Sequence, residues 1–423
     1  MKNQLITINF LQLFVWGAWM MTLGHYGFVE KGWGGAEFGL VFSTMGFASL
    51  IMPMLFGIVA DKWNAKYVYA LLHLCFGLTM CFLPNINSPI IFFWVLLVAM
   101  CFYMPTIGLN NSIGFAVLEA DGKDPTTHFP PIRVWGTIGF ITAMWIANIF
   151  TKEWGLGMSI KVSFIISAIF AFILSAVSFL FLPLIPPQRL ASSNSQKRLV
   201  ERLGIDAFAL FKDKQMALFF IFSMLLGATL QLTNAYGDSF LQDANVFAMG
   251  GLINNFSTII ISVSQISETL FILAIPFFMK KFGIKKVMLF SMSAWVLRFG
   301  LLGVATNTSL GFVLILLSCI VYGIAFDFFN ISGALFVEKH SSKKNRSSAQ
   351  GVFMLMTNGI GAVIGNLVAG LAISKWFEDP ITNIKDWSGI WLSFAAYSLA
   401  VAVAFAFVFK YKHNPKEFSD IKH

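Results

Sequence analysis

The sequence predicts an all-α membrane protein with twelve transmembrane helices arranged as two six-helix bundles. Of its 423 residues, 57% are hydrophobic and only 12% are charged, about half the roughly 25% charged residues of an average soluble protein. Apolar runs recur along the chain, and many of them reach the roughly 20 residues that a helix needs to cross a bilayer. One long hydrophilic stretch near the middle leaves six such runs on each side.

The twelve expected spans follow one another through short connections. In lipid, every backbone polar group must find its partner within the protein, so each isolated apolar run is expected to be a helix. The first six spans are expected at residues 5–28, 37–60, 66–84, 89–114, 131–150 and 161–184. The last six are expected at residues 215–236, 255–280, 284–305, 309–336, 347–374 and 387–411.

The hydrophilic stretch sets the expected domain organisation. It contains two consecutive prolines and a run of serine, lysine and arginine, and no other long polar segment separates the spans. We therefore expect an N-terminal bundle at residues 1–184, a cytoplasmic linker at 185–214 and a C-terminal bundle with a short cytoplasmic tail at 215–423. Equal halves joined by a linker are typical of transporters built from repeated bundles.

The basic residues report the topology of the chain. The net charge is +9, which by itself would be compatible with nucleic-acid binding. If the N-terminus is cytoplasmic, however, 22 of the 29 lysines and arginines fall on the cytoplasmic side of the expected spans and five on the opposite side. This is the asymmetry of the positive-inside rule. It predicts a multi-pass protein in a lipid bilayer with both termini in the cytoplasm, and it indicates no nucleic-acid partner.

Three ionisable residues stand out because they lie deep inside expected spans. Glu268 and Asp327 are the only two of the twenty acidic residues in such positions, and Arg133 is one of only two basic residues there. An ionised side chain at the centre of a membrane costs roughly 2.5–3.5 kcal/mol on insertion scales. Such residues persist where they face the protein interior or a water-filled path, so these three mark a place where something polar crosses the membrane.

Four of the spans carry polar and aromatic side chains at helical spacing. Residues three, four or seven positions apart share one face of a helix. Stripes of this kind also join helices to each other, but this set is larger than packing requires. The predicted site consists of Arg133, Thr137 and Phe140 in the fifth span, Gln231 and Asn234 in the seventh, Gln265 and Glu268 in the eighth, and Tyr322, Phe326 and Asp327 in the tenth.

The chemistry of this set favours a solute with a flat ring and several hydroxyl groups. Side-chain amides offer a donor and an acceptor together, as the edge of a nucleobase requires. The aromatic side chains suit stacking, and the carboxylates suit the neighbouring hydroxyls of a ribose. A sugar would use many of the same groups, so a nucleoside and a sugar both remain open at this point.

The two carboxylates also suggest how transport is driven. The proton affinity of a carboxylate depends on its burial and on nearby arginines. Glu268 and Asp327 are therefore candidates for binding and releasing a proton as the two bundles rock, with Arg133 as their charge partner or a substrate ligand. Sodium is the alternative coupling ion, because carboxylates and carbonyls also bind it.

A short motif follows the second expected span. It consists of Gly57, Asp61 and Lys62 and resembles the loop signature of the major facilitator superfamily. The resemblance implies a conformational latch that clasps neighbouring helix ends, where an anion is stabilised by about 0.3–1 kcal/mol. The alternative interpretation of Asp61 is an ordinary solvated acid in a turn.

Longer stretches resemble one family within that superfamily, the nucleoside:proton symporters of bacterial inner membranes. The similarity covers nearly the whole chain and is most specific at residues 129–140, 210–234, 262–271 and 321–333. It implies the major facilitator fold, nucleoside contacts at all ten residues of the predicted site and a proton as coupling ion. We expect a monomer as the working unit. Thr229 departs from the family pattern, which often has an acid there, so base preference and coupling details do not transfer.

The sequence gives no sign of a cofactor, a metal site or an enzyme active site. Its four cysteines lie in apolar spans and form no metal-binding spacing. A membrane-embedded enzyme would normally carry a hydrophilic catalytic loop, and the one long loop here is rich in serine, lysine and arginine. A solute sensor built on a transporter fold remains the alternative of a different functional class.

Overall fold

The computed structural model describes residues 2–152, 154–184, 210–341 and 346–411, and every named element among them is a helix. Ten of these helical segments are long and apolar enough to cross a membrane. The chain forms two compact units, each with its own set of packed helices. The prediction of an all-helical membrane protein is confirmed.

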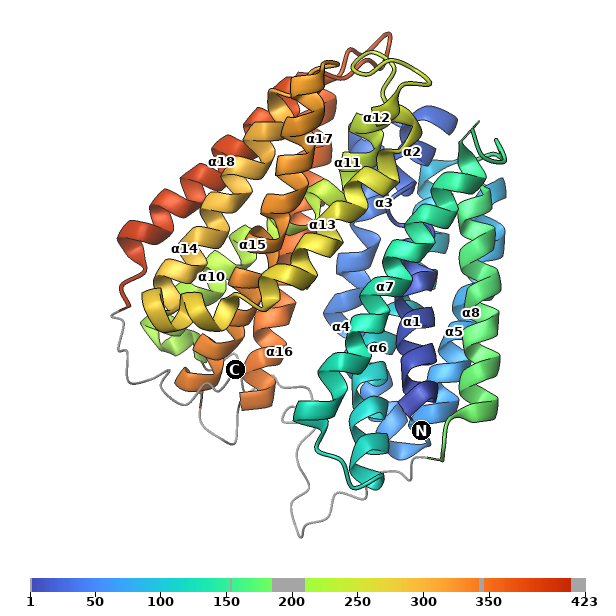
Figure 1. Cartoon of the computed structure of the whole chain (residues 1–423), viewed down its shortest axis with the longest axis vertical. Coiled ribbons are helices and arrows are strands. Elements are labelled where there is room, and N and C mark those ends of the chain that lie inside the picture. Colours follow the sequence, from blue (N-terminus) through green and yellow to red (C-terminus); the bar gives the residue numbers. More distant parts are fainter. Residues whose placement is uncertain (1, 153, 185–209, 342–345, 412–423) are drawn as a thin grey trace. The chain divides into compact units, whose positions relative to one another are not determined.

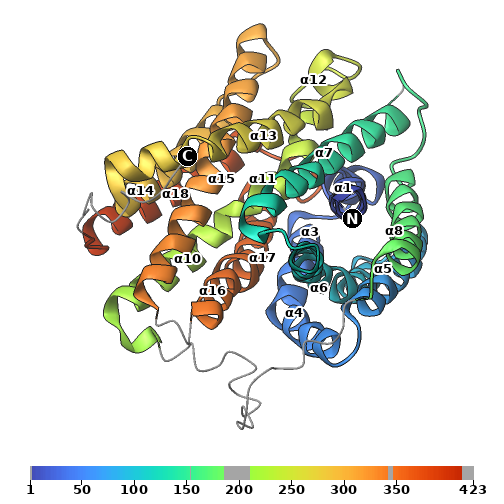
Figure 2. The same ribbon diagram turned by 60° about the horizontal axis from the view of Figure 1, so that its bottom comes forward.

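Unit 1 comprises the described parts of Met1–Ser195, Asn234–Gln242 and Met249–Ile259. Within it, α1 lies between α7 and α8, α5 packs against α8, and α4 packs against α6 (Figures 1 and 2). Its helices are α1 (Lys2–Gly17), α2 (Leu23–His25), α3 (Gly35–Phe42), α4 (Thr44–Lys62), α5 (Ala65–Phe82), α6 (Pro89–Ala120), α7 (Pro125–Thr151), α8 (Val162–Phe181), most of α11 (Leu232–Gln242) and α12 (Leu252–Asn255).

Unit 2 comprises the described parts of Gln196–Thr233, Asp243–Ala248 and Ile260–His423. Here α14 packs against α15 and α18, and α10 packs against η4 and α17. The elements are α10 (Lys214–Leu230), α13 (Ser257–Ile272, with its first turn in unit 1), α14 (Ile275–Gly303), α15 (Ser309–His340), α16 (Arg346–Met354), the π-helices η4 (Leu355–Gly361) and η5 (Ile373–Phe377), α17 (Ala362–Ala372) and α18 (Trp387–Val408).

Two of the twelve expected spans, the first and the eighth, are not among the ten described segments that are long and apolar enough to cross a membrane. The first breaks after α1, where short α2 and the π-helix η1 (Tyr26–Glu30) continue the chain. The eighth is interrupted after the 16 residues of α13 by a short turn and resumes at the start of α14, where Pro276 stands in the first turn and the backbone is again non-helical at Gly283. A proline lacks the backbone donor that a continuing helix would need. The twelve-helix count and the two six-helix bundles therefore stay a prediction.

Glycines decide how closely α1 and α7 approach in unit 1. A Cβ atom at Gly139 would collide with the carbonyl of Phe10, and one at Gly136 would lie 2.9 Å from Leu13 Cδ1. Both glycines stand in α7 on either side of Thr137, which belongs to the predicted site. Because Gly136 and Gly139 have no side chain, α7 can approach α1 closely beside Thr137.

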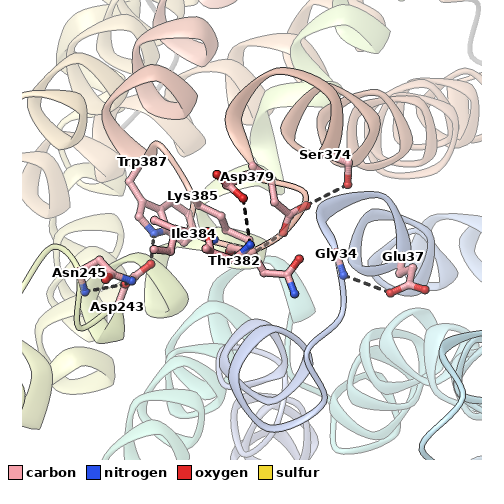
Figure 3. Close-up of polar contacts among 12 residues, drawn as sticks. Gly34, Glu37, Asp243, Asn245, Ser374, Asp379, Thr382, Ile384, Lys385 and Trp387 are labelled. Atoms are coloured by element: carbon pink, nitrogen blue, oxygen red, sulfur yellow. Dashed lines mark hydrogen bonds and ion pairs between the residues drawn. The ribbon is translucent and has the colours of Figure 1, made fainter.

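A polar turn connects η5 to α18 in unit 2 (Figure 3). The carboxylate of Asp379 accepts hydrogen bonds from the backbone N–H groups of Ile381 (2.8 Å) and Thr382 (2.9 Å). The indole of Trp387 donates to Asp243 Oδ2 at 2.6 Å. Asp386 caps the N-terminus of α18 by accepting from the backbone N–H of Gly389 at 3.0 Å. The Asp386 bond satisfies a backbone donor that a helix end leaves without an intrahelical partner, and the Asp379 bonds order the turn before it.

Candidate functional site

The fifth expected span forms α7, and its predicted stripe lies in unit 1. Phe140 is buried, Thr137 is half-buried, and Arg133 is exposed. The guanidinium of Arg133 donates from Nη1 to Asn111 Oδ1 on α6 at 3.4 Å. This contact ties the arginine to a neighbouring helix of the same unit.

The seventh expected span is a broken helix. Helix α10 ends at Leu230 and helix α11 begins at Leu232. Gln231 between them is a turn residue that interrupts the helix. The hydroxyl of Thr229 donates to the carbonyl of Leu226 at 2.6 Å, a local bond that competes with the backbone pattern. The sequence predicted Gln231 and Asn234 on one continuous helix face. The structure instead places Gln231 in the break within unit 2 and Asn234 in the following helix within unit 1. Discontinuous helices of this kind are typical of transporter binding sites.

The eighth expected span supplies Gln265 and Glu268 from α13. Gln265 is buried and Glu268 is half-buried. Among the described residues, none donates a hydrogen bond to the buried Oε1 of Gln265. Because nearly all buried polar atoms in proteins have a partner, this acceptor is suited to a donor on a bound solute.

The tenth expected span, α15, carries Tyr322, Phe326 and Asp327. Tyr322 and Asp327 are buried at 3% and 6% exposure, and Phe326 is half-buried. The rings of Tyr322 and Phe326 stack with centroids 5.5 Å apart and planes inclined by 19°. Trp295 packs its edge against Tyr322 at 5.8 Å, so the tyrosine ring is held from the side of α14.

Close packing brings α13 and α15 together beside these residues. A Cβ atom at Gly323 would lie 2.6 Å from the carbonyl oxygen of Ser267. The hydroxyl of Ser267 in turn donates to the carbonyl of Ile320 on α15. Gly323 follows Tyr322 and Ser267 precedes Glu268, so this close approach holds two of the predicted substrate-binding positions near each other in unit 2.

The sequence left Arg298 without a role, and the structure gives it one. It lies on α14, is 2% exposed, and contacts three other segments of unit 2. Its Nε donates to Thr233 Oγ1 at 3.1 Å, and its Nη1 donates to Ser264 Oγ at 3.3 Å and to the carbonyl of Ser318 at 2.8 Å. The position of Arg298 inside an expected span was the available signal of a role. Its span contains no acid, and its hydrogen-bond partners lie in other segments of the chain, so the sequence did not reveal them.

The sequence also missed a buried acid, Asp238. The expected seventh span stopped at residue 236, whereas α11 continues to Gln242 and places Asp238 inside the helix at 1% exposure. Its carboxylate accepts hydrogen bonds from Gln242 Nε2 at 2.6 Å and from Ser257 Oγ at 2.7 Å. The spacing of four residues between Asp238 and Gln242 was the available signal, because such residues share a helix face.

Lys152 completes this polar cluster at the end of α7. Its ammonium donates to Gln242 Oε1 at 2.6 Å. Burial lowers the pKa of Lys152, and the nearby Asp238 carboxylate offsets part of that shift. The cluster lies in unit 1, and none of its residues belongs to the predicted site.

The predicted latch residues lie at the end of α4. Gly57 and Asp61 are helical, and Lys62 is the exposed last residue of the helix. The side chain of Asp61 lies outside the described part of the structure, so the latch stays a prediction. Most of the predicted linker, residues 185–209, also lies outside the described residues.

A model of the family described as nucleoside H+ symporter matches residues 1–414. The chain belongs to the nucleoside H+ symporter family. It is 47% identical to the nucleoside permease NupG of Escherichia coli (strain K12) over 404 residues, which cover 95% of this chain and 94% of that protein. It is 45% identical to the xanthosine permease of the same organism over 423 residues, covering 99% and 98% of the two chains.

Solved structures agree with this assignment. A crystal structure of the nucleoside transporter NupG matches with a TM-score of 0.87 at 47% identity, over 97% of this chain and 99% of that one. The POT family transporter PepTSo matches with a TM-score of 0.70 at 13% identity, which shows a likeness of fold alone. The predicted resemblance to the nucleoside:proton symporters is confirmed, and with it the predicted function of proton-coupled nucleoside import.

Proposed function

We propose that the protein imports nucleosides together with protons across the bacterial inner membrane by alternating access. In this proposal, residues 1–184 and 215–423 form two bundles of six membrane-spanning helices, with a cytoplasmic linker at 185–214 and both termini in the cytoplasm. A single chain is the working unit, and it needs no cofactor.

The proposed substrate contacts are the ten residues of the predicted site. Gln231, Gln265 and Asn234 would bond the edge of the base, and the stacked rings of Tyr322 and Phe326 would pack against its face. Arg133, Thr137 and Phe140 would contribute from α7. The carboxylates of Glu268 and Asp327 would accept hydrogen bonds from ribose hydroxyls, carry the coupled proton, or both.

One observation carries this proposal above all others. Asp327 is 6% exposed in a helix that is apolar enough to cross a membrane, directly after a pair of stacked aromatic rings. An ionisable group at that depth is costly and marks a functional site. A helix in which aromatic rings and a carboxylate adjoin offers both the apolar and the polar contacts that a nucleoside presents.

Uptake into membrane vesicles tests the proposal. Vesicles containing the protein are given radiolabelled uridine or adenosine under an imposed inward proton gradient, with and without a protonophore. We expect accumulation above the outside concentration that disappears when the protonophore is added. Unlabelled nucleosides should compete, and sucrose or lactose should not. A folded protein that accumulates no nucleoside, or that accumulates it equally well with protonophore, contradicts the proposal.

A further inference from the structure

Arg298 is enclosed by the helices that carry the unit 2 part of the proposed site. Its three acceptors are two hydroxyl groups and a backbone carbonyl, contributed by α11, α13 and α15. The guanidinium also lies over the ring of Tyr322, with its central carbon 4.5 Å from the ring centroid. The hydroxyl of Ser318 donates back to the carbonyl of Arg298 at 3.1 Å.

A buried arginine is an expensive way to join helices. Taking a charge out of water costs several kcal/mol, and the three acceptors here are all neutral. An uncharged residue would pack the same space at lower cost. What an arginine adds is a planar fork whose donors point in fixed directions, so that several partners are held at once in one geometry.

Each partner of Arg298 lies next to a proposed substrate contact. Thr233 stands directly before Asn234 and two residues after Gln231. Ser264 precedes Gln265 on α13. Ser318 lies one helical turn before Tyr322 on α15, and Tyr322 is itself in contact with the guanidinium. One side chain therefore connects the broken helix, the amide of α13 and the stacked aromatic pair of α15.

We propose that Arg298 is a positioning residue for nucleoside binding. It acts through the break at Gln231, through α13 and through the Tyr322 ring, and it does not itself touch the substrate. The inference rests on the proposed function and adds a residue to its site. Because the guanidinium sets the orientation of groups that bind the nucleoside, its loss weakens binding more than it slows the turnover of bound substrate.

The test compares uridine uptake by Arg298→Lys, Thr233→Val and Ser264→Ala proteins with the parent. Lysine keeps the charge but replaces the fork by a single ammonium group. The other two variants each remove one acceptor with little change in volume. Hydrogen bonds to charged groups are stronger than those between neutral groups, so we expect Arg298→Lys to raise KM about tenfold, which corresponds to about 1.4 kcal/mol. Vmax per folded protein should change by less than about threefold, a smaller factor than the change in KM. The single-acceptor variants should raise KM in the same direction by a smaller factor.

Ser388→Ala is the matched control. The hydroxyl of Ser388 on α18 donates to the carbonyl of Gly303 at 2.6 Å, so it joins a neighbouring helix to the same α14 without reaching α11, α13 or α15. Its KM should equal that of the parent. An unchanged KM in Arg298→Lys and in both acceptor variants overturns the proposal, as does a loss of folded protein without a change in KM. The parent protein in the same assay reports on the proposed function separately.

A second network, in unit 1, supports an independent inference. Hydrogen bonds run from Lys152 through Gln242 to the Asp238 carboxylate and on to Ser257, and each is 2.6 or 2.7 Å long. They connect the end of α7, the end of α11 and the first residue of α13. Lys152 follows the fifth expected span, Asp238 and Gln242 follow the seventh, and Ser257 lies in the eighth, so the network joins segments from opposite halves of the chain.

Further bonds reinforce the same junction. Asn254 Nδ2 donates to the carbonyl of Gln242 at 3.0 Å, and the indole of Trp154 donates to the carbonyl of Asn255 at 3.1 Å. The hydroxyl of Thr258 donates to the carbonyl of Met144 on α7 at 3.2 Å.

We infer that this network is a lock that closes one end of the transport path. Alternating access requires segments from the two halves of the chain to separate at one end while they meet at the other. Opening the end at which Lys152 and Asp238 lie therefore requires these charge-assisted bonds to break. The lock sets how often that end opens.

Labelling of an introduced cysteine tests the lock without any substrate. Ser239→Cys places a thiol beside Asp238 at a position that is 3% exposed. Its reaction with a membrane-impermeant maleimide is measured in right-side-out and inside-out vesicles, and the labelling of the parent cysteines is subtracted. Adding Lys152→Met or Ser257→Ala should speed labelling from one side about tenfold, which corresponds to about 1.4 kcal/mol.

Lys161→Met is the control for charge in the same region. Lys161 forms an ion pair with Glu30 at 3.2 Å, and its side chain is 40% exposed. Removing this surface pair should leave labelling unchanged. Equal labelling rates in the parent, Lys152→Met and Ser257→Ala backgrounds would overturn the lock, whatever the result of the uptake assay.

Discussion

Asp327 and Glu268 are the residues on which proton coupling is expected to depend. Asp327→Asn and Glu268→Gln keep the shape of each side chain but remove the group that ionises. We expect either change to abolish gradient-driven accumulation of uridine. Exchange of labelled for unlabelled uridine at equal pH, which needs no net proton movement, should survive in at least one of the two variants.

Vesicle uptake with and without a proton gradient checks this prediction. Ser388→Ala serves as a comparison and should accumulate uridine like the parent, because its hydroxyl bonds to the carbonyl of Gly303 and to none of the proposed site residues. Full accumulation by both carboxylate variants would remove Glu268 and Asp327 from the coupling mechanism and leave the substrate assignment intact.

Gly323 has no side chain, and this allows α15 to lie close to α13 beside the proposed site. A methyl group there would lie 2.6 Å from the carbonyl oxygen of Ser267 and push α13 away from α15. Overpacking of this kind costs about 1–3 kcal/mol. Gly323→Ala should therefore lower the melting temperature of the purified protein and reduce uridine uptake.

Gly300 on α14 provides the matched glycine. A Cβ atom there would meet no described atom within 4 Å. Gly300→Ala should leave the melting temperature unchanged or raise it slightly, because alanine favours a helix by roughly 0.5–1 kcal/mol. Equal melting temperatures and equal uptake in the two variants would contradict the close-contact argument.

At the scale of elements, the broken helix α10–α11 is where sequence and structure differ most. The sequence predicted one span that ended at residue 236 and placed Gln231 and Asn234 on one face. The structure interrupts the helix at Gln231 and extends it to Gln242. Local propensity did not predict the break. The Thr229 hydroxyl bonds locally to the carbonyl of Leu226 just before it, and Thr233 just after it accepts a bond from Arg298, a contact between segments far apart in the sequence.

The turn before α18 gives a pH-dependent prediction for an element outside the membrane. Hydrogen bonds from the backbone N–H groups of Thr382 and Ile381 lower the pKa of Asp379. A carboxylate with a lowered pKa stabilises the folded turn above its ordinary pKa of about 3.9. That contribution is lost as the pH falls through the lowered value in the folded state.

Hydrogen exchange of the segment around residues 379–384 checks this expectation. At pH 7, Asp379→Ala should exchange faster than the parent at the amides of Ile381 and Thr382. The difference between the two proteins should vanish once the pH is low enough to protonate Asp379. A difference that persists unchanged in acid would show that the carboxylate charge is not its cause.

At the scale of the whole molecule, the distribution of basic residues makes a prediction about topology. With 22 of 29 lysines and arginines on one side of the expected spans, both termini should lie in the cytoplasm. A green fluorescent protein fused to the C-terminus should therefore fluoresce, and alkaline phosphatase fused there should be inactive. The same pair of fusions placed after residue 156, in an expected outer loop, should give the opposite result.

The sequence by itself determined the class of the molecule and the chemistry of its site. Composition and the lengths of the apolar runs indicated a helical membrane protein, because no soluble fold could bury so much apolar surface. The rarity of charge inside the membrane singled out Glu268, Asp327 and Arg133. Polar residues at helical spacing then predicted the substrate contacts, and the resemblance to nucleoside:proton symporters predicted the family.

The tertiary structure decided which side chains support that site. Arg298 and Asp238 have partners on other helices, and no pattern within one span can show a bond between segments that are far apart in the sequence. The close approach of α13 and α15 at Gly323 likewise depends on where two helices meet. Sequence periodicity identifies a helix face, whereas packing determines what that face touches.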